Sequence, residues 1–173
     1  MATADIYLAP ENATFFPAAG FPQYTVTNGS NFSVSGLAFS GSGSDIQECY
    51  WKFNPAQYDG ASDFTVNIEW YGTTLTSGSV VFSVSFAAIT PNTDTGSVLT
   101  KVYDTSTSVT TPHPGTTAAR LIQSSVTVPR ANLDSAEAGD EVWMSLFRSA
   151  AAAADTYTNF ATVTSVRISY EMA

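Results

Sequence analysis

The sequence predicts an all-β protein: an antiparallel two-sheet sandwich, a jelly roll of about eight strands with an extended N-terminal arm. Three observations support this. Apolar and polar residues alternate with period two over several segments of the 173-residue chain. Turn residues, mainly Gly, Pro and Asn, separate these segments. Helical periodicity is nearly absent, and the alanine-rich run 150–154 is too short to nucleate a helix unaided.

The alternation is clearest in residues 64–71. Phe64, Val66, Ile68 and Trp70 share one face there, and Thr, Asn and Glu side chains share the other, as in a half-buried strand. The same pattern recurs at 79–89, 141–148 and 160–170. We expect weaker strands at 32–39, 49–53, 98–103 and 120–128.

Cysteine usage separates two kinds of sandwich. An immunoglobulin-type domain usually pairs two cysteines around a core tryptophan. Cys49 is the only cysteine, so a jelly roll fits better. We interpret Cys49, beside Tyr50 and Trp51, as a small buried hydrophobe.

Residues 1–31 differ from the rest and define the expected arm, and residues 32–173 the jelly-roll domain. The arm is aromatic, follows neither period and is interrupted by three prolines, so it cannot form a core alone. It either lies across its own domain or reaches another subunit. Its candidate partner-binding residues are Tyr7, Phe15, Phe16, Phe21 and Tyr24.

Segment 141–148 is apolar on both faces, since Trp143 and Phe147 lie opposite Val142, Met144 and Leu146. We therefore expect something to cover Trp143 and Phe147, and count them as partner-binding candidates.

Arg148 and Asp155 flank the run 150–154, and we predict that they pair to close this loop. The alternative is two unconnected exposed charges.

The charge balance excludes several partners. Six Lys and Arg against 15 Asp and Glu give a net charge of -9, and the cations are scattered along the chain. Nucleic acids and anionic membranes require clustered cations, so we expect neither as a partner. The N-terminus has no basic start or apolar run, and no stretch approaches the roughly 18 apolar residues of a membrane span, so we expect a soluble protein made in a cytoplasm.

The sequence contains few candidate catalytic residues. His113, the only histidine, lies between two prolines, which predicts an exposed extended loop. One histidine and one cysteine exclude the common zinc sites, so we expect no metal or cofactor. Fifteen acids will offer carboxylate pairs in any sandwich, but none is marked as a glycosidase pair. We predict that the chain is not an enzyme.

Several motifs carry a resemblance that covers about residues 37–171. They are aromatic-x-Phe-x-Pro at 51–55, Tyr58-Asp59-Gly60, an alternating strand ending at Trp70, the segment 78–86, Gly139-Asp140, Arg148 with Asp155-Thr156, and a last strand ending at Tyr170. Together they resemble a jelly-roll domain of tailed-phage structural proteins, most closely capsid decoration (cement) proteins.

The resemblance implies a non-enzymatic virion protein on the capsid exterior, a homotrimer that binds the major capsid protein and stabilises capsomer junctions. The alternative is a receptor- or glycan-binding head domain of a phage fibre or tail protein, with exposed aromatic residues as the sugar contacts. A sandwich-fold hydrolase is disfavoured, because the histidine and the acids lack a catalytic arrangement.

Overall fold

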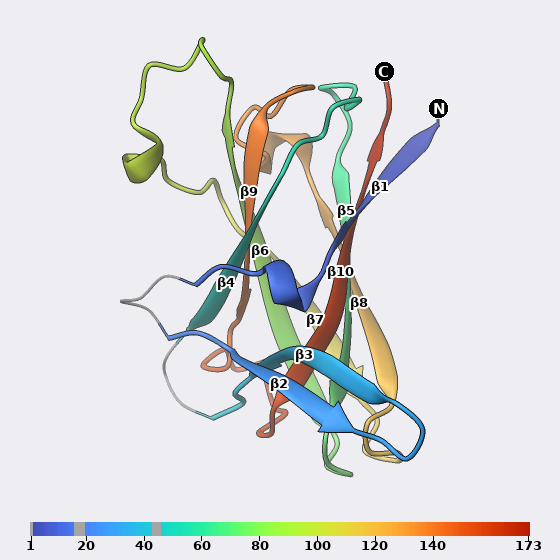
Figure 1. Cartoon of the computed structure of the whole chain (residues 1–173). Coiled ribbons are helices and arrows are strands. Elements are labelled where there is room, and N and C mark those ends of the chain that lie inside the picture. The colour runs from blue at the N-terminus through green and yellow to red at the C-terminus, as the bar shows by residue number, and fades with distance from the viewer. Residues whose placement is uncertain (1, 16–19, 43–45) are drawn as a thin grey trace.

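The computed structural model describes residues 2–15, 20–42 and 46–173, and shows two antiparallel sheets packed face to face (Figure 1). The six-stranded sheet contains β1 (Thr3–Leu8), β2 (Gln23–Asn28), β3 (Ser33–Phe39), β5 (Phe64–Gly72), β8 (Leu121–Val128) and β10 (Ala161–Glu171). The four-stranded sheet contains β4 (Gln47–Phe53), β6 (Gly78–Ile89), β7 (Thr107–His113) and β9 (Glu141–Arg148). Short 3₁₀ turns are η1 (Pro10–Asn12), η2 (Val98–Thr100) and η3 (Arg130–Asn132). The predicted all-β sandwich is confirmed.

The strand order is that of a jelly roll. Four antiparallel pairs follow one another along what would be one long hairpin: β3 with β10, β4 with β9, β5 with β8, and β6 with β7. Pairing of β10 with β5 and of β9 with β6 rolls this hairpin into the orders β3-β10-β5-β8 and β4-β9-β6-β7. The predicted jelly roll is therefore confirmed by the topology itself.

The core lies between the sheets and follows the alternation. Phe64, Val66, Ile68 and Trp70 of β5 are fully buried, and they face the buried apolar residues of β6 and β9. Cys49 is buried as expected, and burial raises the pKa of its thiol. Aromatic rings meet mostly edge to face, as Phe64 and Phe86 do at 5.6 Å between centroids.

One predicted strand is wrong, and three strands of the structure, β1, β2 and β7, were not predicted. Residues 98–103 form η2 and coil, in a loop that leaves the sandwich after β6 (Figure 1). Val98, Leu99 and Val102 are exposed, so their apolar pattern has no sheet to pack on. The partner of β6 is instead β7, whose threonine-rich sequence, ending in Pro112-His113, resembles a loop. With β1 and β2, the described residues form ten strands rather than about eight.

The N-terminal segment lies across its own domain. β1 and β3 share one edge of β10: β3 pairs with Ala161–Val163, and β1 with Val166–Glu171. Between β1 and β2 the chain crosses to the other sheet, where Thr14 and Tyr50 exchange two backbone hydrogen bonds of 2.8 and 2.9 Å. The expected arm thus supplies two strands of the larger sheet. The domain division at residue 31 stays a prediction.

Within the three described ranges, no helix has the length and apolar character needed to span a bilayer.

Candidate functional site

The aromatic residues predicted for the arm do not converge on one site. Tyr7 is 71% exposed on β1, and Tyr24 is half exposed on β2, where its hydroxyl donates to Glu11 at 3.1 Å. Phe15 and Phe21 pack on each other, 5.5 Å between ring centroids, beside the edge of β4. Phe16 lies outside the described residues.

Trp143 is covered by this chain's own β6–β7 loop. A hollow of about 260 Å³ lies between Trp143, Ala87 and the loop residues Leu99 and Tyr103. Tyr103 stacks on Tyr50 of β4 at 5.8 Å. Burial is the main cause that raises the pKa of both tyrosines. Phe147, farther along β9, stays half-buried.

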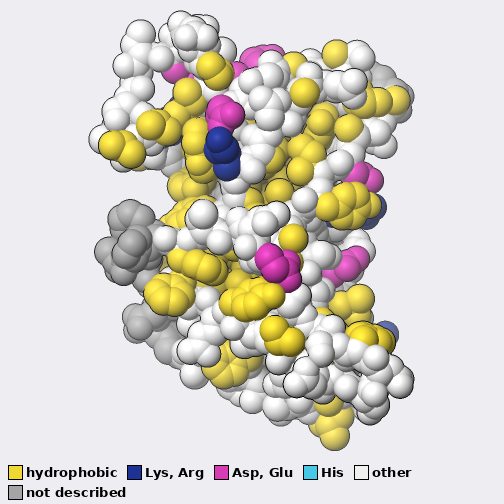
Figure 2. Space-filling model, viewed as in Figure 1, with side chains coloured by type: hydrophobic (Ala, Val, Ile, Leu, Met, Phe, Trp, Pro, Cys, Tyr) yellow, Lys and Arg dark blue, Asp and Glu magenta, His cyan; other side chains and the backbone are white. Residues whose placement is uncertain are grey.

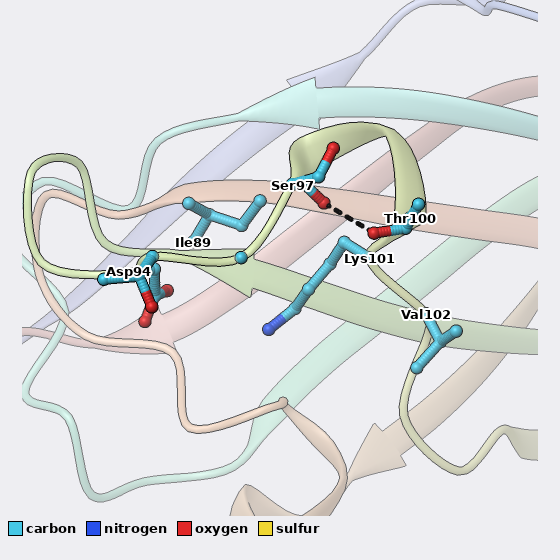
Figure 3. Close-up of a pocket in the computed structure, with 8 residues that line it drawn as sticks. Ile89, Asp94, Ser97, Thr100, Lys101 and Val102 are labelled. Atoms are coloured by element: carbon cyan, nitrogen blue, oxygen red, sulfur yellow. Dashed lines mark hydrogen bonds between the residues drawn. The ribbon is translucent and has the colours of Figure 1, made fainter.

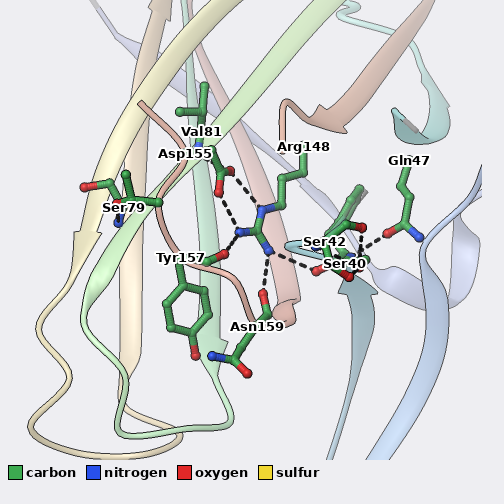
Figure 4. Close-up of polar contacts among 11 residues, drawn as sticks. Ser40, Ser42, Gln47, Ser79, Val81, Arg148, Asp155, Tyr157 and Asn159 are labelled. Carbon is green, nitrogen blue, oxygen red and sulfur yellow. Dashed lines mark hydrogen bonds and ion pairs between the residues drawn. The ribbon is translucent and has the colours of Figure 1, made fainter. Parts of the chain in front are cut away.

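The structure brings Arg148 and Asp155 together in a fully buried ion pair (Figure 4). Arg148 Nη2 and Nε donate to the two carboxylate oxygens at 2.7 and 2.9 Å. The remaining guanidinium hydrogens reach the main-chain oxygens of Phe39, Asn159 and Tyr157. Since all five N–H donors are used, the side chain organises the β9–β10 loop and has none left for a ligand.

The predicted location of His113 in an exposed loop is wrong. The residue ends β7 and is 1% exposed. Its ring lies 4.8 Å from the Tyr157 ring and 6.1 Å from Trp70, and its Nδ1 is 3.0 Å from the Thr76 carbonyl oxygen. The flanking prolines favour extended backbone, which suits a strand end as well as a loop. The imidazole contacts no nucleophile or carboxylate in the described part of the chain, so it belongs to the core.

Two further hollows are candidate sites. The first, about 360 Å³, lies inside the β6–β7 loop (Figure 3). Apart from Ile89, its walls are residues 94–102 of this one loop. Lys101 is held by Asp134 at 2.8 Å and is not free for a ligand.

The second hollow, about 560 Å³, lies on the outer face of the six-stranded sheet, and we call it the outer groove. The turn of the β2–β3 hairpin forms one wall with Phe32, and Leu121 at the start of β8 forms the other. Tyr71 of β5 and Thr164 of β10 form the floor between them. The full lining is Thr27, Gly29, Ser30, Asn31, Phe32, Val34, Tyr71, Ala119, Leu121 and Thr164.

The hairpin closes this groove because two small features let it bend over the sheet. Gly36 of β3 passes so near β10 that an added Cβ would lie 2.7 Å from the Val163 main-chain oxygen, so only glycine fits. A register shift in β10 between Val163 and Ser165 ends its pairing with β3. The hydroxyl of Tyr71 then donates to Thr27 Oγ1 at 2.9 Å and ties the hairpin to the floor.

The outer groove combines apolar walls with uncharged polar groups. Its walls are apolar at Phe32, Val34 and Leu121, and hydroxyl and amide groups lie between them. Tyr71 is the one titratable residue among those that line it, so it offers no acid–base pair. Elsewhere in the described ranges, no three His, Cys, Asp or Glu side chains gather as a metal site.

Polar side chains continue along the sheet beyond the groove. Ser165 donates to Glu69 Oε2 at 2.9 Å, and Gln123 donates to Asn67 Oδ1 at 2.8 Å. A smaller hollow of about 170 Å³, lined by Phe160 and Thr162, shares Thr27 with the outer groove.

The sequence did not predict the outer groove. Its lining residues come from five strands and two loops, and no spacing along the chain joins them. One signal was available: Leu121 is an apolar residue on a strand face that is otherwise polar.

No family model and no curated protein matches the chain. Solved structures of carbohydrate-binding modules are similar in fold. "CBM35 from Cellvibrio japonicus Abf62" is 9% identical, with 95% of this chain and 92% of that chain covered and a TM-score of 0.47. A mannan-recognising module, TmCBM27, is 8% identical over 99% and 100%, at 0.47. A "xylan-binding module CBM15" is 11% identical over 99% of each chain, at 0.46. Identities this low and TM-scores below 0.5 say nothing about what this chain binds.

Proposed function

We propose that the protein is a non-catalytic glycan-binding domain that takes an uncharged sugar chain in the outer groove. The observation that carries this proposal is the groove itself, an open hollow of about 560 Å³ with apolar walls, hydrogen-bonding groups between them and no charged side chain in its lining. This is the glycan-binding alternative predicted from the sequence, at a site that the sequence did not point to.

The lining matches the two kinds of surface that a sugar ring presents. The C–H faces of a pyranose are apolar and pack on aromatic and aliphatic side chains, as Phe32 and Leu121 offer. Its hydroxyls need donors and acceptors, which Thr27, Asn31 and Thr164 supply. An anionic sugar would have no cation in the lining to pair with, and burying an unpaired charge is costly.

A panel of soluble xylan, mannan and mixed-linked β-glucan tests the proposal by retardation in affinity electrophoresis. We expect at least one of them to slow the protein, and Phe32→Ala to abolish the effect, because this 72%-exposed ring is a wall of the groove. The matched control is Phe21→Ala, which removes an exposed phenylalanine beside β4 and should bind as the unmodified protein does.

Two results contradict the proposal. One is the absence of retardation by a panel extended to further neutral glycans. The other is retardation that Phe32→Ala leaves unchanged.

The capsid-decoration function predicted first stays a prediction. No feature of the described residues and no comparison supports a homotrimer, the major capsid protein as partner, or a place on the virion exterior.

A further inference from the structure

We propose that β2 is a self-association edge, through which two copies of the chain pair antiparallel and join their six-stranded sheets into one. β2 ends the order β2-β3-β10-β5-β8, and the described residues place no further strand beside it. A terminal strand directs every other N–H and C=O away from its sheet, so its free side is a template for another strand.

β2 lacks the devices that normally protect such an edge. Its six residues, Gln23–Asn28, include no charged residue and no proline. Its pairing with β3 runs through six consecutive partners without a bulge. Tyr24 and Val26 are 49% and 56% exposed, and Figure 2 shows hydrophobic side chains among the polar surface on this side of the molecule. The carboxylate of Glu11 accepts the Tyr24 hydroxyl hydrogen but belongs to η1 and not to the strand.

The other edges are protected. Thr14 and Gly20 bridge to β4 and cover its free side. β7 carries Pro112, which has no N–H to donate. β1 carries the charged Asp5, and β8 lies alongside β7 of the other sheet. Among the edges that the structure describes, β2 is therefore the one most open to pairing.

A second copy of this chain is the occupant that the strand fits. In an antiparallel pair of identical strands, the N–H and C=O row of one copy meets the same row of the other around a two-fold axis. The whole chain has a net charge of -9, but no carboxylate lies on β2, so the two edges can meet without like charges facing each other. The axis is perpendicular to the joined sheet, so both outer grooves would lie on one face.

The pair should be weak, since six residues per copy bury less than the roughly 800 Å² per partner of a stable complex. Sedimentation equilibrium of the full chain, from low to several hundred micromolar, tests the proposal. We expect the weight-average mass to rise with concentration from 18.3 kDa toward twice that value.

Val26→Lys should hold the mass at that of a monomer at all concentrations, because it places two cations beside the two-fold axis. The matched control, Val102→Lys, adds the same charge at a 76%-exposed position on the β6–β7 loop, and should dimerise as the unmodified chain does.

A charge swap separates a lost interface from a lost fold. Val26→Lys and Val26→Glu should each be monomeric alone, and an equimolar mixture should regain the dimer mass, because opposite charges then meet in the pair. A monomeric unmodified chain at the highest concentration overturns the proposal. So does a trimeric mass, a Val26→Lys variant that dimerises normally, or a mixture that stays monomeric.

Discussion

Arg148 holds the ends of three segments together. Its guanidinium binds Asp155 and three main-chain oxygens, and Asp155 Oδ2 also accepts the Val81 N–H at 3.0 Å. The sequence predicted the pair from the two charges that flank the alanine run. It did not predict the main-chain partners, since Phe39 is 109 residues away along the chain.

Arg148→Met should therefore be severely destabilising. It leaves the Asp155 carboxylate buried without its counter-ion, which typically costs about 3–5 kcal/mol of unfolding free energy. The measurement is urea denaturation followed by tryptophan fluorescence.

The control is Lys52→Met, which removes an ion pair of 2.6 Å to Glu141 whose side chains are 55% and 38% exposed. An exposed pair contributes about 1 kcal/mol or less, so the denaturation midpoint should scarcely move. Equal losses of unfolding free energy in the two variants would contradict the prediction that the buried Arg148 pair matters more to stability than the exposed Lys52 pair.

At the scale of elements, the N-terminal segment shows how far local pattern reaches. The sequence left open whether it lies on its own domain, because prolines obscure its alternation. In the structure, the side chains of β1 alternate between the two faces of the strand. Ala4, Ile6 and Leu8 point to the core, and Asp5 and Tyr7 point outward.

Adjacent residues of β1 should accordingly respond in opposite ways. Leu8→Ala removes a side chain that is 6% exposed, and should cost about 2–5 kcal/mol of unfolding free energy. Tyr7→Ala removes a ring that is 71% exposed, and should change it by no more than about 0.5 kcal/mol. Thermal and urea denaturation of both variants provide the check, and comparable losses would mean that β1 does not pack as described.

At the scale of the whole molecule, four of the eight tyrosines lie in places that disfavour their ionisation. Burial is the largest cause that raises the pKa of Tyr50, Tyr58, Tyr103 and Tyr170, and for Tyr58 it reaches about 12. Two of them pack in the core and two stack outside β4. The folded state therefore favours the neutral phenol more strongly than the unfolded chain does.

This difference predicts alkaline destabilisation. A tyrosine of the unfolded chain has a pKa of about 10. The contribution of these four tyrosines to the free energy of unfolding is therefore fully present below about pH 10. The free energy of unfolding should fall as pH rises from about 10 toward 12, because the unfolded chain then releases more protons.

Urea denaturation at about pH 8 and about pH 11 measures the effect. The double variant Tyr50→Phe/Tyr103→Phe should show a smaller fall between the two pH values, since two of the four groups can no longer ionise. An unfolding free energy that is the same at both pH values would contradict the prediction.

The sequence by itself determined what depends on neighbours along the chain. Period two identified the long strands, and the faces that they bury, because a pleated strand points successive side chains to opposite sides whatever it pairs with. It also identified the Arg148–Asp155 pair, whose members are seven residues apart.

Only the tertiary structure decided what depends on residues far apart. Residues 98–103, whose apolar pattern predicted a strand, form an exposed loop, because β6 already has β7 and β9 as neighbours. His113 is buried because Trp70 and Tyr157 meet over it. The outer groove exists because Gly36 lets a hairpin bend over the sheet until Thr27 reaches Tyr71, 44 residues away. Alternation records which side of a strand is buried, but contacts between strands arise only when the chain closes on itself.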